Sequence, residues 1–550
     1  LPDAARPLMD LDAILRRAEA LKERSNWNNV FQQIAERVLP EMAEFTSQRT
    51  EGERRTEKMF DPTPALAARK AISAISAFAW PSNQRYQKLT TNDPDLNKIQ
   101  RVKAYFDEVT DRIFRARYSP RASFESQMAE LALMSHVFGT GPMFVDEDIK
   151  RQTLRYKSLH LANTYVAEDA SGRIDTVYLC PPWTVRQIAQ RWPDSMPEKV
   201  RAKLITTPDE KIDVGFLCGP REDYESGRLG PRGLPFFGVY FLPSEKHKLE
   251  ETGYSSWPFV VHRHMTTPGE VYGRSPTWLV LSSIKVLNQQ KKSILQAAQK
   301  IVDPPLLAHE DGVLSAFSQV PGAVNFGALD AQGNQLVKPL ITGARVDIGL
   351  DMMDREREMI ADANLMDIMR VLIENPQMTA TQTLELLNER AVIMAPIIGR
   401  YESEVFSPMT EREIDLLSRA GQLPEMPPEL LEAAGEYKIE FTSPMRRAMR
   451  SSDAIAITRT MESVMSMAQV QPNVLDTFDM DAIVRELADI NGVPAKCLRD
   501  EDAMRALKDQ RAGEAEAAQL LEAAPVVSSS LKNLAQAQAA GGLQPGMVAA

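Results

Sequence analysis

The feature that most constrains how this chain can fold is a long helical segment near its middle. Between residues 276 and 302, apolar side chains recur at three- and four-residue spacing, which predicts one amphipathic helix. Pro276 suits the first turn of that helix, and Pro304 and Pro305 prevent it from continuing. At a rise of about 1.5 Å per residue, the helix would be a rod about 40 Å long.

The polar face of this predicted rod is basic. Residues 276–302 contain four lysines and no acidic residue, in a chain with a formal net charge of −11. A second long helix is predicted over 350–373, and residues 350–374 hold seven acids against three arginines. Two rods of similar length and opposite charge should pack antiparallel, and they can also pair with the rods of neighbouring subunits.

Two kinds of pattern precede the first rod. From 142 to 268, short apolar runs alternate with turns, which indicates strands, and one short helix is expected near 184–192. Before this region the periodicity is helical, and Gly139 ends the last helix. The predicted helical stretches lie at 10–39, 61–80, 97–117 and 122–138. The fold class is therefore mainly α with an α+β region.

The segments around the second rod complete this prediction. Residues 303–349 hold glycine, proline and short apolar runs, which favours a small β-containing excursion between the rods. After a break at 374–380, a long helix is expected to kink at Pro396 and Pro408. The remaining pattern predicts a strand, a helical region and a flexible tail, at 437–444, 445–525 and 526–550.

The composition of the chain limits the classes of protein to which it can belong. A hydrophobic fraction of 43% with 25% charged residues is ordinary for a soluble globular protein. The three cysteines are few and far apart, so a reducing compartment fits better than a disulfide framework or a zinc cluster. No apolar run has membrane-spanning length, and the first residues lack a secretory signal pattern. The acidic balance argues against a DNA-coating protein, but not against one that lets DNA pass without gripping it.

The sequence offers only weak candidates for a catalytic, cofactor-binding or metal-binding site. The segment from Gly269 to Ser275 lacks both the spacing and the lysine of a phosphate-binding loop. His262 and His264 share one face of a strand, but no third metal ligand is near, which favours a structural role. The acidic run at 146–148 is interpreted as a surface rather than a cation site. We therefore predict no catalytic, cofactor-binding or metal-binding residue, and no cofactor.

Several short motifs are distinctive beyond their periodicity. They are FGTG at 138–141, EVYGRSP at 270–276, VDPPLL at 302–307, MTAT at 378–381 and YKIEFTSP at 437–444. Together they resemble, over about residues 10–510, the portal (head-to-tail connector) proteins of short-tailed bacteriophages. One departure lies in the strand at 177–182, which lacks an arginine found in that family and so leaves local contacts there in question.

The resemblance implies how the predicted segments are used. Residues 1–268 would form N-terminal helices and an α+β wing, and residues 381–444 a kinked wing helix with a closing strand. The two rods, at 269–302 and 350–373, would be stem helices joined by a clip at 303–349. The remaining parts would be a channel loop, a helical crown and the flexible tail, at 374–380, 445–525 and 526–550.

The resemblance also implies a non-enzymatic function. Twelve copies would form a ring at one capsid vertex, through which double-stranded DNA is packaged, retained and ejected without sequence specificity. The partners would be the terminase large subunit, the major capsid and scaffold proteins and the tail adaptor proteins, with no membrane. The protein would assemble in the host cytoplasm and reside in the virion. Twelve inner rods about 10 Å apart leave a hole of about 28 Å, which passes a B-form duplex.

Candidate functional residues follow from this assignment. The channel loop would present Asn375, Pro376, Gln377, Met378 and Thr379, although a plain helix–helix connection fits the same pattern. Charges on the rods are candidates for contact with DNA or with neighbouring subunits: Lys285, Lys292, Lys300, Arg355 and Arg370. A solvated helix face and ion pairing between the rods are the alternatives for the lysines. In the clip, the similar candidates are Lys338 and Arg345.

A second hypothesis belongs to a different class. The chain would then be a soluble oligomeric enzyme with its active site in the α+β region at 142–268. Turnover that disappears when His262 or Asp146 is replaced would favour this hypothesis over the first.

Overall fold

The structure is a computed structural model, and it describes most of the chain between residues 10 and 514. The residues outside the description in that span are 48–49, 51, 54–55, 149–150, 152, 226, 309–317, 319, 330–331, 342, 344–345, 366–391, 434, 469–470, 491–492, 494–496, 498 and 500–503. The chain divides into two compact units. The first comprises Leu1–Lys88, Val109–Leu423 and Ile439–Ala456, and the second Leu89–Glu108, Pro424–Lys438 and Ile457–Ala550.

The N-terminal helices follow the predicted periodicity closely. Asp10 caps the first helix, because its carboxylate accepts a hydrogen bond from the backbone N–H of Asp12. Gly139 ends the last of these helices in the left-handed conformation, as a glycine can without strain. The helices are α1 (Leu11–Lys22), α2 (Ser25–Val38), α3 (Thr63–Ala79), α4 (Gln100–Arg117) and α5 (Phe124–Phe138).

The region at 142–268 has the predicted α+β character. A five-stranded antiparallel sheet has the order β10-β9-β8-β5-β4, and a three-stranded sheet has the order β11-β2-β3. The five strands of the larger sheet are β4 (Thr164–Glu168), β5 (Ile174–Leu179), β8 (Gly215–Pro220), β9 (Phe236–Leu242) and β10 (His247–Tyr254). The smaller sheet consists of β2 (Thr140–Asp148), β3 (Thr153–Ser158) and β11 (Phe259–Arg263).

Some elements of this region were not predicted. Strand β10 lies at an edge of the larger sheet and buries only Leu249, so its sequence lacks the apolar alternation of a half-buried strand. The helix at 184–192 is present as α6 (Val185–Arg191), and a second helix, α7 (Glu198–Thr206), follows it. A small antiparallel pair, β6 (Pro182–Thr184) and β7 (Lys211–Asp213), flanks these helices.

The core of the first unit is organised around α5. This helix is apolar on most of its circumference, as expected for a helix enclosed by other elements. On one side, Val137 and Phe138 join a cluster with α2, the larger sheet and the bases of the two long helices. On the other, Met128 and Leu131 join a cluster with α3, β2, β3 and the segment after residue 392. The long helices are thus rooted in the same core as the sheets.

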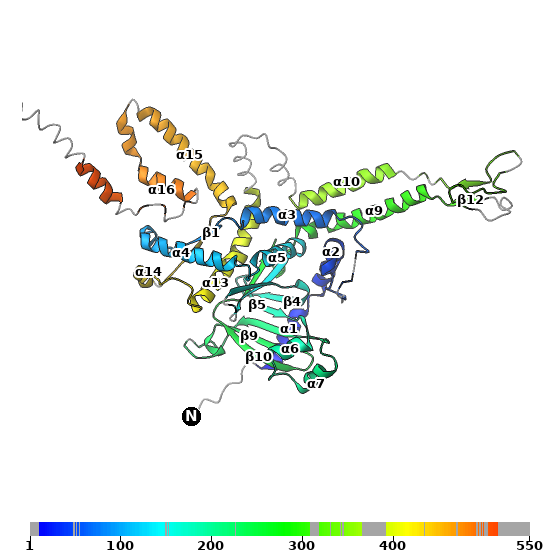
Figure 1. Ribbon diagram of the computed structural model, residues 1–550, viewed down its shortest axis with the longest axis horizontal. Coiled ribbons are helices and arrows are strands. Elements are labelled where there is room, and N and C mark those ends of the chain that lie inside the picture. The colour runs from blue at the N-terminus through cyan, green and yellow to red at the C-terminus, as the bar shows by residue number, and fades with distance from the viewer. Residues whose placement is uncertain are drawn as a thin grey trace, which may run out of the picture. The chain divides into compact units, whose positions relative to one another are not determined.

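The two rods are present and run antiparallel (Figure 1). The predicted helix over 276–302 consists of α8 (Pro276–Leu279) and α9 (Leu281–Val302), with a short interruption at Val280. Its partner α10 (Val346–Ala363) begins four residues earlier than predicted. The predicted end at residue 373 is wrong, because the helix ends at Ala363 in a turn where Leu365 adopts a left-handed backbone conformation (φ 56°). Between them, β12 (Leu306–Ala308) pairs antiparallel with β13 (Val337–Pro339), which confirms a β-containing excursion.

The long helix that was predicted to kink at Pro396 and Pro408 is irregular only near Pro408, among its described residues. Residues 392–400 are helical without interruption through Pro396. A π-helical segment, η5 (Tyr401–Phe406), then leads into α13 (Ser407–Arg419), with Pro408 in its first turn. The irregularity therefore lies just before Pro408, whose missing backbone N–H interrupts the regular hydrogen-bond ladder.

The remaining elements are helical apart from one strand. Strand β14 (Lys438–Phe441) pairs with β1 (Gln87–Thr90), within the stretch where a strand was predicted. The helices are α14 (Pro428–Glu432), α15 (Pro444–Ala468) and α16 (Met480–Ile490), and residues 504–514 are also helical. The tail at 526–550 lies outside the described residues. Within the described part of the chain, no helix combines the length and apolar character needed to cross a membrane.

Candidate functional site: the paired rods and their anchor

Two of the distinctive sequence motifs meet at the base of the first rod. A Cβ atom on Gly139 would lie 2.1 Å from the carbonyl oxygen of Gly273, and one on Gly273 would lie 2.3 Å from that of Gly139. The backbone N–H of His264 donates to Gly139 O (2.9 Å), and that of Gly273 donates to the Thr140 hydroxyl (2.9 Å). Each position therefore requires glycine, because any side chain would meet backbone atoms.

The start of the rod is fixed by a cap and by aromatic packing. Ser275 accepts a hydrogen bond from Trp278 N (2.9 Å) and donates one to Val137 O (2.8 Å), which ties the rod to α5. The Trp278 ring packs edge-on against Trp27, with ring centroids 5.1 Å apart, and against Phe31 at 6.2 Å. The first turn of the rod is thus held by aromatic side chains of α2 and by a backbone carbonyl of α5.

Both rods are anchored to the residues that precede α3. On α9, the buried Asn288 side chain accepts hydrogen bonds from the backbone N–H groups of Phe60 (2.6 Å) and Asp61 (3.1 Å). On α10, Arg357 donates to the Asp61 carboxylate at 2.6 and 3.3 Å. Residues 60–61 therefore connect the two rods to each other and to the core; we call Phe60, Asp61, Asn288 and Arg357 the rod anchor.

The anchor carboxylate is held in its charged form. Burial by itself would raise the pKa of Asp61, but hydrogen bonds from Thr63 and Arg357 outweigh it and lower the pKa. Thr63 contributes through both its hydroxyl and its backbone N–H, so Asp61 also satisfies the first backbone N–H of α3.

The lysines of the first rod do not neutralise the acids of the second. Lys285 donates to the Gln33 side chain, and the Lys292 ammonium lies 5.7 Å from the centre of the Phe60 ring. Lys300 is exposed near the end of α9. Among the described residues, none of these lysines forms an ion pair with α10, so the alternative of ion pairing between the two rods of one chain is not observed.

Apolar contacts hold the rods together instead. Gly349 allows a close approach, since a Cβ atom there would lie 2.7 Å from Ile294 Cδ1. Ile284 and Leu287 of α9 and Met353 and Ile360 of α10 are buried in the shared core. The pair is therefore a unit whose charged faces point away from its own contact surface.

Comparison with known proteins identifies the family of the chain. The family described as bacteriophage head to tail connecting protein matches residues 11–498. The chain belongs to this family. It is 26% identical over 540 residues to the portal protein of Salmonella phage epsilon15, a match that covers 96% of each chain. It is also 27% identical over 518 residues, 90% of each chain, to the probable portal protein of Bordetella phage BPP-1.

In this connector protein, both rods carry apolar side chains that the single chain leaves uncovered. On α9, Leu295 is 51% exposed and Val302 is 85% exposed. On α10, Leu350 and Met352 are similarly exposed. Apolar side chains that stay exposed on one projecting element are candidates for contact with another protein.

Several predicted site residues cannot be placed. Asn375, Pro376, Gln377, Met378, Thr379, Arg370 and Arg345 all lie outside the described residues. Of the other candidates, Arg355 is exposed on α10, and Lys338 lies on β13 opposite Leu307. The candidates on the described parts of the two rods therefore lie together on the projecting rod pair. The predicted channel loop lies outside the described residues.

His262, on β11, and His264, directly after it, are buried in packed core rather than exposed. The His262 ring stacks on Tyr401 with centroids 3.7 Å apart, and its Nδ1 contacts the Ser135 hydroxyl. Burial lowers the pKa of His262, and it lowers that of His264 to about 3. In the described part of the chain, no group of three His, Cys, Asp or Glu residues is arranged to hold a metal ion.

The acidic run at 146–148 makes ion pairs. Asp146 lies 3.3 Å from Arg412 of α13, and Asp148 lies 3.7 Å from Arg151. These contacts agree with the structural interpretation of this run.

Sequence reasoning missed the rod anchor and one fully buried ion pair. Arg117 and Glu413 are completely enclosed, and two guanidinium nitrogens of Arg117 donate to the carboxylate at 2.6 and 3.0 Å. They lie 296 positions apart in the sequence, so no local pattern links them. A weak signal existed for the anchor, since Asp61 precedes Pro62 and Thr63 in a typical helix-start pattern.

Proposed function

We propose that this chain is the subunit of a ring-shaped phage portal that conducts double-stranded DNA through one vertex of the capsid. Family membership over residues 11–498 supports the portal function. The observation that supports the ring is the rod pair, which projects basic and apolar side chains that no part of its own described chain covers. In a ring, neighbouring rod pairs cover the apolar faces of each other.

The resemblance to portal proteins implies twelve subunits, and this number is compatible with the diameter that DNA needs. Twelve inner rods spaced about 10 Å apart enclose a hole of about 28 Å, which admits a B-form duplex with little slack. Twelve chains of 61.5 kDa have a mass of about 740 kDa. The acidic net charge of −11 keeps most of the assembly repulsive to DNA, so that the duplex slides rather than sticks.

Each segment has a place in this assembly. We assign α9 and α10 to the stem, residues 303–349 to the clip, and residues 374–380 to a channel loop. The α+β region at 142–268 and the helix with its π-helical turn form the wing, and residues 445–525 form the crown. Lys285, Lys292, Lys300, Arg355 and Arg370 of the stem contact DNA or neighbouring subunits, and Lys338 and Arg345 act in the clip.

The proposed portal works without enzymatic activity of its own. A terminase large subunit docks on the clip and drives DNA inward, and tail adaptor proteins bind the same end afterwards. Major capsid and scaffold proteins contact the wing. Assembly takes place in the host cytoplasm, and the finished ring is a component of the virion.

Particle mass and shape test the ring directly. Light scattering coupled to size exclusion should give about 740 kDa for the purified protein, and negative-stain images should show a central hole. The Leu295→Asp variant places a charge on the exposed apolar face of α9 and should shift the protein towards the 61.5 kDa monomer. Ile205→Asp is the matched control, because Ile205 is an exposed apolar residue of α7, outside the rods.

Either of two results would contradict the ring proposal. A wild-type protein that remains a monomer at packaging concentrations, or rings that form equally well with Leu295→Asp, would contradict the proposal. A complementation assay then tests the function: capsids assembled with Leu295→Asp should contain no genome, whereas those with Ile205→Asp should be filled.

A further inference from the structure

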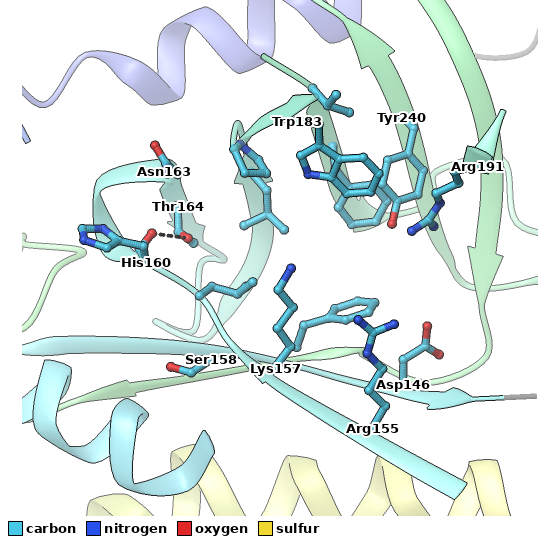
Figure 2. A pocket seen from close by; sticks show the side chains of 16 residues that line it. Asp146, Arg155, Lys157, Ser158, His160, Asn163, Thr164, Trp183, Arg191 and Tyr240 are labelled. Atoms are coloured by element: carbon cyan, nitrogen blue, oxygen red, sulfur yellow. Dashed lines mark hydrogen bonds between the residues drawn. The ribbon is translucent and has the colours of Figure 1, made fainter. Parts of the chain in front are cut away.

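A cavity in the α+β region belongs to none of the roles described above. It has a volume of about 410 Å³ and lies between the strands β2 and β3 of the smaller sheet and β5, β8 and β9 of the larger one (Figure 2). Strand β6 and the end of α6 complete its wall. This volume is typical of pockets that hold a small organic ligand.

Three cations line this cavity. Arg155 and Lys157 lie two positions apart on β3, so they share one face of the sheet, and Arg191 is the last residue of α6. Among the described residues, none of the three forms an ion pair. The cavity therefore has a concentration of positive charge in a chain that is acidic as a whole.

The single acidic residue of the wall does not neutralise these cations. Asp146 lies opposite Arg155 in the β2–β3 register, where a cross-strand ion pair would be expected. Its carboxylate instead lies 3.3 Å from Arg412, which approaches from α13. Asp146 thus remains in the wall of the cavity, but its charge is paired with Arg412 rather than with the cations of the cavity.

The Lys157 side chain extends into the cavity below the rings of Trp183 and Tyr240 (Figure 2). Lys157 keeps part of its surface exposed, and the partial burial of its ammonium group lowers the pKa, which the charges of Arg155 and Arg191 lower further. An anion bound in the cavity would stabilise all three charges at once. The hydroxyl of Ser158, also in the wall, is buried and has no hydrogen-bond partner in the described structure.

The opposite wall is aromatic. Trp183 stacks on Trp192 with centroids 5.5 Å apart and an interplanar angle of 22°. Arg191 lies 4.6 Å above the Tyr240 ring and 4.9 Å above the Trp192 ring, so aromatic faces rather than a carboxylate hold it in position. A rigid indole plane beside a group of cations suits a ligand that combines a flat ring with an anion.

We propose that this cavity binds a nucleoside phosphate, either free or as the terminal nucleotide of a DNA strand. The phosphate is held by Lys157 with Arg155 and Arg191, and the base stacks against Trp183. An acidic peptide fits less well, because a carboxylate carries one charge and no attached plane, whereas a phosphate monoester carries about two charges. The site goes beyond portal function and does not depend on ring formation, since one chain supplies every residue.

Titration of the purified full-length protein with thymidine monophosphate tests the proposal, with tryptophan fluorescence and calorimetry as readouts. We expect saturable binding with quenching of the indole emission, and at least tenfold weaker binding of thymidine and of inorganic phosphate. A short single-stranded oligonucleotide with and without a 5′-phosphate distinguishes the strand end from the free nucleotide. Hexaglutamate serves as the acidic-peptide competitor.

Two variants and a matched control make the result specific. Lys157→Met retains the aliphatic part of the side chain, and Trp183→Leu removes the stacking plane; each should weaken nucleotide binding at least tenfold. Arg155→Gln substitutes for Trp183→Leu if the latter does not fold. Lys199→Met should bind like the wild type, because Lys199 is an exposed lysine of α7 outside the cavity.

The proposal fails if neither the nucleotide nor the 5′-phosphorylated strand binds, or if Lys157→Met binds them as tightly as the wild type. Tighter binding of hexaglutamate than of the nucleotide would assign the cavity to an acidic peptide instead. None of these results alters the particle mass, so this inference and the ring proposal can fail separately.

Discussion

Arg357, on the second rod, donates two hydrogen bonds to the carboxylate of Asp61, at 2.6 and 3.3 Å, across 296 positions of sequence. The backbone N–H groups of Phe60 and Asp61 donate hydrogen bonds to the side chain of Asn288, on the first rod. Two helices that already pack against each other are therefore also fixed to one point of the core. This geometry matters for any function that requires the rods of several subunits to be held at one angle.

Replacement of Arg357 by methionine should loosen the second rod. The change leaves the buried Asp61 carboxylate without its charged partner, which costs about 1–3 kcal/mol of unfolding free energy. Denaturant unfolding of the variant measures this loss. Arg355→Met is the control on the same helix, because Arg355 is exposed, and it should change stability by less than about 0.5 kcal/mol. Equal effects of the two variants would show that the ion pair does not anchor the rod.

The contribution of Asp61 should depend on pH in a defined direction. Its pKa is lowered in the folded protein, so the stabilisation is complete above the unfolded value of about 3.8 and disappears as the pH falls through the lower folded pKa. The difference in unfolding free energy between wild type and Asp61→Asn should therefore be constant from pH 7 to 5 and shrink below about pH 4. A difference that grows on acidification would contradict this assignment.

The buried histidines predict a second pH dependence, at milder acidity. Burial and nearby positive charge lower the pKa of His264 to about 3, whereas an unfolded histidine titrates near 6.5. The unfolded state then binds more protons below pH 6.5, so stability should decrease there by up to about 1.4 kcal/mol per pH unit for each such histidine. Unfolding measured at pH 7.5, 6.5 and 5.5 should show this slope, and His264→Leu should reduce it. Val261→Ala, a buried change without a titrating group, should lower stability but leave the slope intact.

The close approach of Gly139 and Gly273 predicts that position 273 does not tolerate a side chain. In Gly273→Ala, the new Cβ would meet the Gly139 carbonyl oxygen at 2.3 Å, so the backbone at the base of the first rod must shift. We expect a loss of more than about 2 kcal/mol, or failure to express as folded protein. Gly399→Ala is the control: it lies in a helix with open space around its Cβ position, and it should be neutral or stabilising by about 0.5–1 kcal/mol.

The rod lysines should act between molecules rather than within the chain. Lys285 contacts Gln33 and Lys292 lies over Phe60, and neither forms an ion pair among the described residues. The double variant Lys285→Glu/Lys292→Glu should therefore unfold with nearly wild-type stability, yet impair ring assembly or DNA retention in packaged heads. The neutral pair Lys285→Gln/Lys292→Met separates loss of positive charge from added repulsion. Normal rings and normal packaging with the glutamate pair would exclude both roles for this face.

The long elements could be predicted because their causes are local. The apolar spacing over 276–302 and the flanking prolines were sufficient to predict the first rod, and Asp10 was sufficient to predict the start of α1. One local detail of the first rod was not predicted. The rod is interrupted at Val280, after a first turn capped by Ser275. Edge strand β10 was missed for the opposite reason, since its partly buried charged residues leave it without an apolar pattern.

By itself, the sequence determined the helix and strand periods, the opposite charges of the two rods and, through its motifs, the family. Only the tertiary structure decided which distant residues meet. It joined Gly139 to Gly273, Asp61 to Arg357 and Arg117 to Glu413, and it paired Asp146 with Arg412. The physical reason is that helical and strand periods arise from contacts within a few residues, whereas a buried charge or a close backbone approach depends on how whole elements pack.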